Sequence, residues 1–233
     1  MKTRILVVVA AMMLLFSCAE KRTNPLIQNL DNSWIVTTDT LDIKMQVDIP
    51  SVIQADMYEN GLIPHPYKSN IEPQLLWIPQ HEWTYTLDFN AEDYILNEDV
   101  VELVFEGLDT YADVWFNGEH ILYSDNMFRT YSCNVKNLIK EKNNIKIKFH
   151  PFDKVRDSLI ETYPLRFPEK YAVMRKAAYQ NGWDWAPRYM NMGIWQPVYL
   201  KVWTHSTISS ASVITTDIQN DKAKLAFEVC VDA

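Results

Sequence analysis

Hydrophobic and polar residues alternate with a period of two through much of this chain, which is the pattern of strands that bury one face. The residues concerned are mainly β-branched or aromatic, the types that favour strands. Nine runs predict strands: Trp34 to Thr37, Ile43 to Ile49, Trp83 to Phe89, Val100 to Phe105, Ala112 to Phe116, His120 to Tyr123, Phe128 to Val135, Ile145 to Phe149 and Trp195 to Trp203. Many short strands joined by turns predict an all-β fold, a jelly-roll sandwich of two sheets.

Turn and helix signals divide these strands. Asn117-Gly118 separates two of the runs and predicts a tight β-hairpin. Only a few short helices are expected, from Val52 to Glu59 and from Phe152 to Thr162. The segment from Asp153 to Arg188 is the main excursion from the sandwich, and long connections of this kind commonly carry binding groups.

The last part of the chain predicts two further strands, from Ala211 to Asp217 and from Ala223 to Asp232. The second of them places four apolar side chains on one face: Leu225, Phe227, Val229 and Val231. Nothing else in a chain of this length is left to cover that face, and an isolated hairpin is marginal in water. We therefore expect residues 205–233 to be the first strands of a second sandwich.

The chain starts with Lys2 and Arg4, followed by 12 apolar residues from Ile5 to Phe16 and by Ser17-Cys18. This run is shorter than the roughly 20 residues that span a bilayer, and a small residue before Cys18 suits cleavage and lipid attachment. We expect residues 1–17 to be a lipoprotein signal peptide and residues 18–25 a tether. The protein would then be held in the periplasm or at the outer-membrane surface through Cys18. The alternative is an ordinary secretory signal.

Composition limits the chemistry. The net charge is −8, or −10 without Lys2 and Arg4, which argues against nucleic acid as a partner. The five histidines are scattered without ligand spacing and no C-x-x-C is present, so we expect no metal. No glycine-rich phosphate loop and no G-x-S-x-G elbow occurs, so we expect no cofactor and no serine nucleophile.

Two tryptophans flank one aspartate in the stretch Asn181-Gly182-Trp183-Asp184-Trp185-Ala186-Pro187-Arg188. An aromatic plane can cover the C–H face of a sugar ring while a carboxylate accepts hydrogen bonds from two hydroxyls. We interpret this stretch as a sugar-binding loop. The alternative is a half-buried strand with both indoles in the core and Asp184 in solvent.

The same stretch, with Gly193-Ile194-Trp195-Gln196-Pro197 after it, resembles the G-W-D-W-G-P-R and G-I-W-R-P motifs of the N-terminal domain of family 2 β-mannosidases. Further segments follow the family's order: residues 60–64, 76–78, 101–114 and 125–129. The resemblance extends over roughly residues 30 to 230. Ala186 stands where the family usually has glycine. If that backbone needs a positive φ, alanine there would cost about 1 kcal/mol.

This resemblance implies a galactose-binding-like jelly roll over residues 26–204 and the start of an immunoglobulin-like domain over residues 205–233. In the family a (β/α)8 barrel follows and carries the two glutamates of a retaining glycosidase. No catalytic residue is therefore expected in this chain, which alone should be inactive. The resemblance implies that Trp183 and Asp184 contact a terminal mannose. Trp185, Arg188 and Trp195 would support the loop, the two indoles as core residues and the guanidinium as an internal donor.

Other polar and apolar residues are given structural roles. Glu106, Asp109 and Asp113 are interpreted as strand-end and turn residues, and Tyr189, Met190 and Met192 as packing residues. The favoured hypothesis is the front part of an exo-acting β-mannosidase. A stand-alone, lipid-anchored glycan-binding module is the alternative, and a decayed gene product without function is the third possibility.

Overall fold

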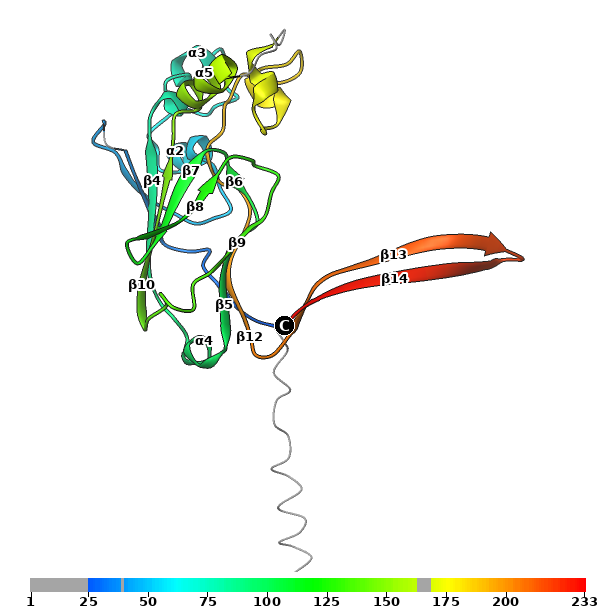
Figure 1. Cartoon of the computed structure of the whole chain (residues 1–233). Coiled ribbons are helices and arrows are strands. Elements are labelled where there is room, and N and C mark those ends of the chain that lie inside the picture. The colour runs from blue at the N-terminus through cyan, green and yellow to red at the C-terminus, as the bar shows by residue number, and fades with distance from the viewer. Residues whose placement is uncertain (1–24, 39, 163–168) are drawn as a thin grey trace, which may run out of the picture.

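The structure is a computed structural model that describes residues 25–38, 40–162 and 169–233 (Figure 1). Two antiparallel sheets face each other. The six-stranded sheet has the order β3 (Lys44–Val47), β2 (Trp34–Thr37), β4 (Trp83–Asn90), β10 (Lys142–Phe149), β7 (Ala112–Phe116) and β8 (Glu119–Ser124). The four-stranded sheet has the order β1 (Leu26–Asn29), β12 (Val198–Trp203), β5 (Val100–Phe105) and β9 (Tyr131–Asn134).

The core lies between these sheets because alternate residues of each strand point inward. In β4 the side chains of Trp83, Tyr85 and Leu87 are buried, and in β10 those of Ile145, Ile147 and Phe149. The buried indoles also satisfy their N–H groups. Trp34 Nε1 donates to the Leu30 carbonyl at 2.7 Å and Trp83 Nε1 to the Ile78 carbonyl at 2.9 Å.

Short helices cap the ends of the sandwich: α2 (Ile53–Glu59), α3 (Glu72–Leu75), α4 (Asp93–Asn97), α5 (Phe152–Thr162) and the 3-10 turns η1 (Ile78–Gln80), η2 (Lys170–Val173) and η3 (Ala178–Asn181). In Figure 1, α2, α3 and α5 gather at one end and α4 at the other. A two-stranded piece, β6 (Leu108–Asp109) with β11 (Gly193–Ile194), lies beside the main sheets.

The predicted all-β jelly roll is confirmed. Strands β2, β5 and β7 and helix α5 have the bounds expected from the sequence. The hairpin at Asn117-Gly118 is present, and both residues have positive φ, 51° and 89°, as a tight turn of this kind requires. Three strand predictions were too long: the strand expected from Ile43 to Ile49 is confined to Lys44–Val47, the one expected from Phe128 begins at Tyr131, and the one expected from Trp195 begins at Val198.

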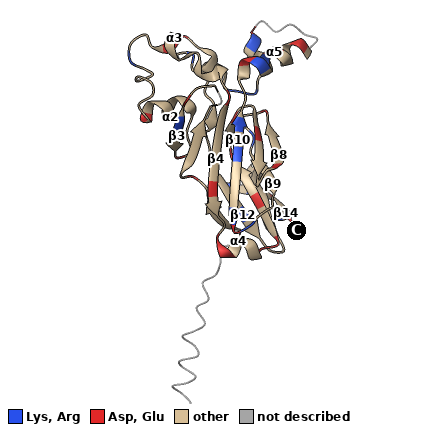
Figure 2. Cartoon of the chain, turned by 90° about the vertical axis from the view of Figure 1, so that its left-hand side faces the viewer, with Lys and Arg blue, Asp and Glu red and all other residues tan. Residues whose placement is uncertain are grey.

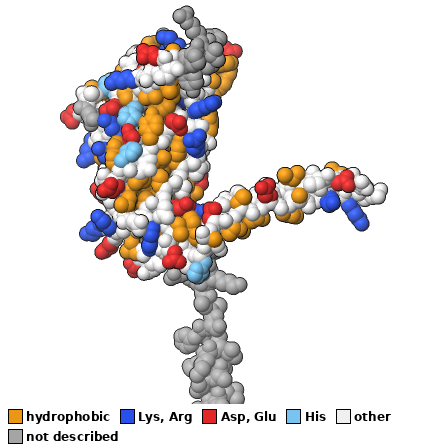
Figure 3. Space-filling model, viewed as in Figure 1, with side chains coloured by type: hydrophobic (Ala, Val, Ile, Leu, Met, Phe, Trp, Pro, Cys, Tyr) orange, Lys and Arg blue, Asp and Glu red, His pale blue; other side chains and the backbone are white. Residues whose placement is uncertain are grey.

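The last two strands, β13 (Thr207–Gln219) and β14 (Lys222–Asp232), form a ribbon that projects from the sandwich (Figure 1). The expected apolar face is uncovered, with Phe227 70% exposed. Figure 3 shows hydrophobic side chains along the whole ribbon. The expectation that this face finds no cover among the described residues is met.

Charged residues of both signs are spread along the strands of the sandwich, as the colours in Figure 2 show for the face that carries β4 and β10. Within the described residues, no helix is long and apolar enough to cross a membrane. The predicted signal peptide and Cys18 lie outside the described residues.

Candidate functional site

The excursion between α5 and β11 lies at the end of the sandwich that also carries α2 and α3 (Figure 1). It contains a tight turn. The Trp183 N–H donates to the Ala186 carbonyl at 3.0 Å, and the Ala186 N–H donates to the Trp183 carbonyl at 3.3 Å. These two bonds leave Asp184 and Trp185 at the tip.

The side chains of this turn point outward. Trp183 is 53% exposed and Trp185 is 69% exposed, and Asp184 is exposed as well. The alternative with both indoles in the core is therefore wrong, and so is the expectation that Trp185 is a core residue. Period-two spacing predicted a strand here, but the chain reverses between Trp183 and Ala186, so both indoles stand on a projecting tip.

Gly182 is the residue next to the turn that needs to be glycine. Its φ of +92° is readily adopted by glycine and is strained for a residue with a Cβ, which would also lie 3.4 Å from Arg188 Cβ. Ala186 is not among the residues with positive φ, so alanine at this position brings no strain of that kind. Arg188 is exposed and makes no hydrogen bond to the described residues, which corrects its assignment as an internal donor.

A buried polar network fixes the base of the excursion. Lys176 forms an ion pair with Asp109 of β6, and the two side chains are 2% and 1% exposed. Lys176 Nζ also donates to the Asn191 carbonyl at 2.5 Å, and Gln180 Nε2 donates to Asp109 Oδ2 at 3.1 Å. Burial lowers the pKa of Lys176, and the Asp109 charge opposes that shift. The network joins both arms of the excursion to the sandwich.

This network was not predicted from the sequence. Asp109 was interpreted as a turn or strand-end residue, and Lys176 carried no signal because the two lie 67 positions apart.

Trp195, expected to support the loop, is half-buried and donates from Nε1 to the Met127 carbonyl at 3.1 Å. The sulfur of Met127 in turn accepts a hydrogen bond from the Ala177 N–H at 3.1 Å, so Met127 links Trp195 to the excursion. Tyr189, Met190 and Met192 are buried, as predicted.

The turn borders a hollow of about 190 Å³ that sequence reasoning did not find. Tyr67, Tyr179, Trp185 and Tyr189 supply its aromatic walls. The rings of Tyr179 and Trp185 lie 5.5 Å apart, and those of Tyr67 and Tyr189 lie 5.7 Å apart. Aromatic walls with an exposed carboxylate nearby can cover the face of a sugar ring and bind its hydroxyls.

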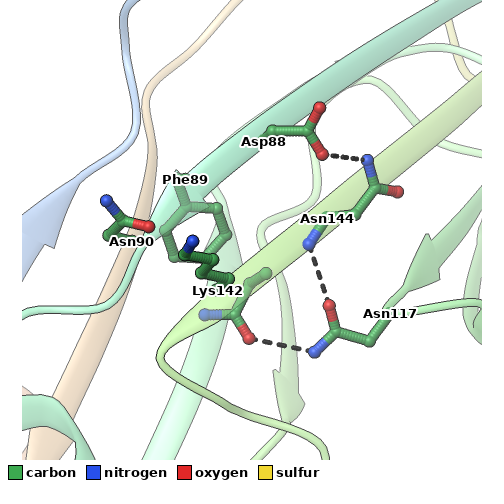
Figure 4. A pocket seen from close by; sticks show the side chains of 7 residues that line it. Asp88, Phe89, Asn90, Asn117, Lys142 and Asn144 are labelled. Atoms are coloured by element: carbon green, nitrogen blue, oxygen red, sulfur yellow. Dashed lines mark hydrogen bonds between the residues drawn. The ribbon is translucent and has the colours of Figure 1, made fainter.

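A larger hollow, of about 390 Å³, is lined by the end of β4, the start of β10 and Asn117 of the hairpin between β7 and β8 (Figure 4). Its polar groups bond to one another. Asn117 Nδ2 donates to Asn143 Oδ1 at 2.9 Å, and Asn144 Nδ2 donates to Asp88 Oδ1 at 2.7 Å. These amides brace the turn and leave few free groups for a ligand, so we do not place the site there.

His120 and His150, which show no ligand spacing in the sequence, lie close together on the outer face of the six-stranded sheet. Asp113 Oδ1 lies 2.6 Å from His120 Nε2, and Oδ2 lies 2.7 Å from His150 Nε2. Burial raises the pKa of Asp113, but the hydrogen bonds from His150 and His120 outweigh it, and the pKa is lowered. In the part of the chain that the structure describes, no group of three or more His, Cys, Asp or Glu side chains could hold a metal ion.

Helix α2, at the same end of the sandwich, contains a buried carboxyl group, that of Asp56. Ser51 Oγ donates to Asp56 Oδ1 at 2.5 Å and Tyr85 OH donates to Oδ2 at 3.1 Å. Burial nevertheless raises the pKa of Asp56 from 3.8 to about 6. A group of this kind stabilises the fold below its unfolded pKa, and that contribution is lost as the pH rises through the folded pKa.

Replacement of Asp56 by asparagine is therefore expected to remove a pH dependence. Between pH 4 and pH 7 the stability of Asp56→Asn should rise relative to the parent by about 3 kcal/mol, since each pKa unit corresponds to about 1.36 kcal/mol. Urea unfolding at several pH values measures this difference. Asp93→Asn, at an exposed position on α4, is the matched control and should show no such trend. A parallel pH profile for Asp56→Asn and the parent would contradict the assignment.

The two facing sheets and the projecting Trp-Asp-Trp turn define a class of protein: a galactose-binding-like β-sandwich with a candidate carbohydrate site at one end. The comparison with known families agrees. Residues 29–196 match the family described as glycosyl hydrolase 2 galactose-binding domain-like, and the chain belongs to this family.

Its relatives include several β-mannosidases. β-Mannosidase A of Emericella nidulans is 32% identical over 182 residues, which cover 73% of this chain and 19% of the relative. β-Mannosidase B of Thermothelomyces thermophilus is 30% identical over 226 residues, 87% of this chain and 26% of the relative. The crystal structure of a β-D-mannosidase from Dictyoglomus thermophilum superposes with a TM-score of 0.84 at 30% identity, over 89% of this chain and 26% of that chain.

This chain thus spans about a quarter or less of the length of these relatives. It corresponds to their N-terminal region.

Proposed function

We propose that this chain is the N-terminal part of an exo-acting, retaining β-mannosidase that removes terminal β-D-mannose from oligosaccharides or glycoconjugates. One observation carries the proposal: an exposed Trp-Asp-Trp tip stands on a buried polar base, in a chain whose relatives include β-mannosidases. In this proposal the turn from Trp183 to Ala186 forms one wall of the sugar subsite.

The chemistry of the tip supports this role. Asp184 makes no hydrogen bond to the described residues, so both its oxygens remain open to two sugar hydroxyls. Trp183 offers its indole plane to the C–H face of the ring. A wall that closes one side of a subsite suits the removal of a single terminal sugar.

The reaction itself needs two carboxyl groups about 5 to 5.5 Å apart, one as general acid and one as nucleophile. The proposal places this pair in a part of the enzyme outside this chain, so the chain alone is expected to be inactive. It needs no cofactor.

The test starts from the source cells. An antibody against residues 26–203 should isolate a polypeptide several times heavier than 27.3 kDa that hydrolyses an aryl β-mannoside and leaves an aryl β-glucuronide intact. In that protein Asp184→Ala should lower kcat/KM about 100-fold, because the loss of two charge-assisted hydrogen bonds costs about 3 kcal/mol or more. Asp93→Ala, remote on α4, is the control. A heavy species without β-mannoside hydrolysis would overturn the proposal.

We also propose that Cys18 carries a lipid that holds the protein in the periplasm or at the outer-membrane surface. Metabolic labelling with a radioactive fatty acid should mark the parent and not Cys18→Ser. Equal labelling of the two would refute the anchor.

A stand-alone glycan-binding module is the second candidate, favoured by the exposed aromatic side chains at the excursion. In that case the antibody would detect a single band near 27.3 kDa that binds sugar without hydrolysing it.

A further inference from the structure

A band of aromatic rings runs from α2 to the tip of the excursion. Successive ring centroids lie 5.0 Å apart for Tyr58 and His65, 6.3 Å for His65 and Tyr67, and 5.7 Å for Tyr67 and Tyr189. Beyond Tyr189, the pair Tyr179 and Trp185 continues on the other side of the hollow described above. The band therefore joins three separate parts of the chain.

Two hollows lie along this band. The one beside α2 has a volume of about 220 Å³, and the one beside the tip about 190 Å³. Tyr67, Tyr189 and Asn191 line both of them, so the two hollows adjoin. We name these two adjoining hollows, from α2 to Trp185, the aromatic groove.

The walls of the groove are held in place. The Tyr189 hydroxyl donates to the Pro66 carbonyl, which ties the segment before Tyr67 to the excursion. The Tyr67 N–H donates to His65 Nδ1 at 3.1 Å, so in the neutral imidazole the proton is on Nε2, which becomes a donor. Bonds to the backbone thus hold the Tyr189 hydroxyl and the His65 ring in place.

The lining of the groove is neutral. None of the residues around either hollow is Asp, Glu, Lys or Arg. The polar groups are hydroxyls, the imidazole of His65 and the amides of Gln54, Gln180 and Asn191. Aromatic planes alternating with amides suit a ligand with apolar faces and many uncharged hydroxyls. No cation lines either hollow to pair with an anionic ligand there.

One buried amide in this lining has a free acceptor. Gln54, on α2, is 5% exposed, and its Nε2 donates to the Met190 carbonyl at 3.1 Å. Its Oε1 has no hydrogen-bond partner among the described residues. Buried acceptors are usually paired, but this oxygen is itself shielded from the hollow, so it is not counted as a ligand contact. The polar contacts of a ligand therefore fall to Asn191 and His65, which line the hollow beside α2 and are less buried.

We propose that the aromatic groove binds a neutral oligosaccharide, with pyranose rings stacked on the aromatic band and hydroxyls bonded to the side chains of Asn191 and His65. The proposal rests on the proposed function only in taking carbohydrate as the ligand that meets this end of the sandwich. It assigns contacts beyond the single sugar at Trp183 and Asp184.

The test uses the 233-residue protein and β-1,4-linked mannohexaose as probe, with binding measured by NMR titration at millimolar sugar. The parent should bind the hexaose and show no binding of hexagalacturonate. Tyr67→Ala should weaken binding about 10-fold, since one aromatic contact is worth about 1.4 kcal/mol. Tyr67 is 74% exposed, so its replacement leaves the core intact. Phe128→Ala, an equally large exposed aromatic outside the groove, should bind like the parent.

The outcomes separate the two proposals. Undiminished binding by Tyr67→Ala, absence of hexaose binding by the parent, or equal binding of hexagalacturonate would overturn the groove while β-mannoside hydrolysis by the heavy species still stood. Binding that depends on Tyr67, together with a heavy species that hydrolyses no β-mannoside, would support the groove and remove the proposed enzyme.

Discussion

Lys176→Met is expected to destabilise the protein by about 3 to 5 kcal/mol, because it leaves the buried carboxylate of Asp109 without its cation. The remaining partners of Asp109 are neutral donors, Gln180 Nε2 at 3.1 Å and the Thr110 hydroxyl. They cannot balance a full charge in a site from which water is excluded. The Asn191 carbonyl would lose its ammonium donor as well.

The double variant Asp109→Asn, Lys176→Met separates charge from packing. With both charges gone, no ion is left buried and unpaired, so the double variant should be more stable than Lys176→Met. Urea unfolding of the parent, the two single variants and the double variant gives the coupling energy. Arg129→Met is the control, since Arg129 and Asp125 are 60% and 56% exposed and lie 3.6 Å apart, and it should cost at most about 1 kcal/mol. A similarly small cost for Lys176→Met would refute the assignment of a buried pair.

Gly193→Ala should be similarly damaging, at about 3 to 5 kcal/mol. The φ of Gly193 is +147°, and a Cβ there would lie 2.8 Å from the Ser51 carbonyl oxygen and 3.0 Å from both Val52 Cα and Tyr85 OH. Two of these atoms are backbone at the start of α2, and they cannot move without shifting the helix. Backbone strain and overpacking each cost about 1 to 3 kcal/mol.

Gly118→Ala is the matched control for this second change. Gly118 also has a positive φ, +89°, but no atom lies within 4 Å of its hypothetical Cβ. Its replacement should cost only the backbone term, about 1 kcal/mol. The difference between the two variants in urea unfolding measures the close approach of α2 and β11. Equal costs would mean that Gly193 is needed for its φ alone.

The strands whose bounds were predicted correctly include β2 and β7. In both, burial alternates along the strand itself, so the local pattern in the sequence is sufficient. Strand β1 was missed because it has only four residues at a sheet edge and none of them is fully buried. Strands β6 and β11 have two residues each, too few for any period to be visible.

The candidate site was predicted only in part. The motif located the Trp-Asp-Trp tip, but the exposure of Trp185 depends on a turn closed by two backbone hydrogen bonds, which period-two spacing does not distinguish from a strand. The base and the groove depend on contacts between distant segments. Tyr189 meets Pro66 across 123 positions, and Gln54 meets Met190 across 136 positions. Such pairs are set by the topology of the sandwich, and no local pattern reports them.

The ribbon of β13 and β14 has a consequence for the behaviour of this protein in solution. Each of its two edges presents unpaired backbone N–H and C=O groups, and its side chains add an uncovered apolar surface that includes Ile218, Phe227 and Val231. Strands of another molecule can add to either edge of the ribbon, and the apolar side chains beside those edges favour such an addition. We therefore expect the purified chain to associate through the ribbon as its concentration rises.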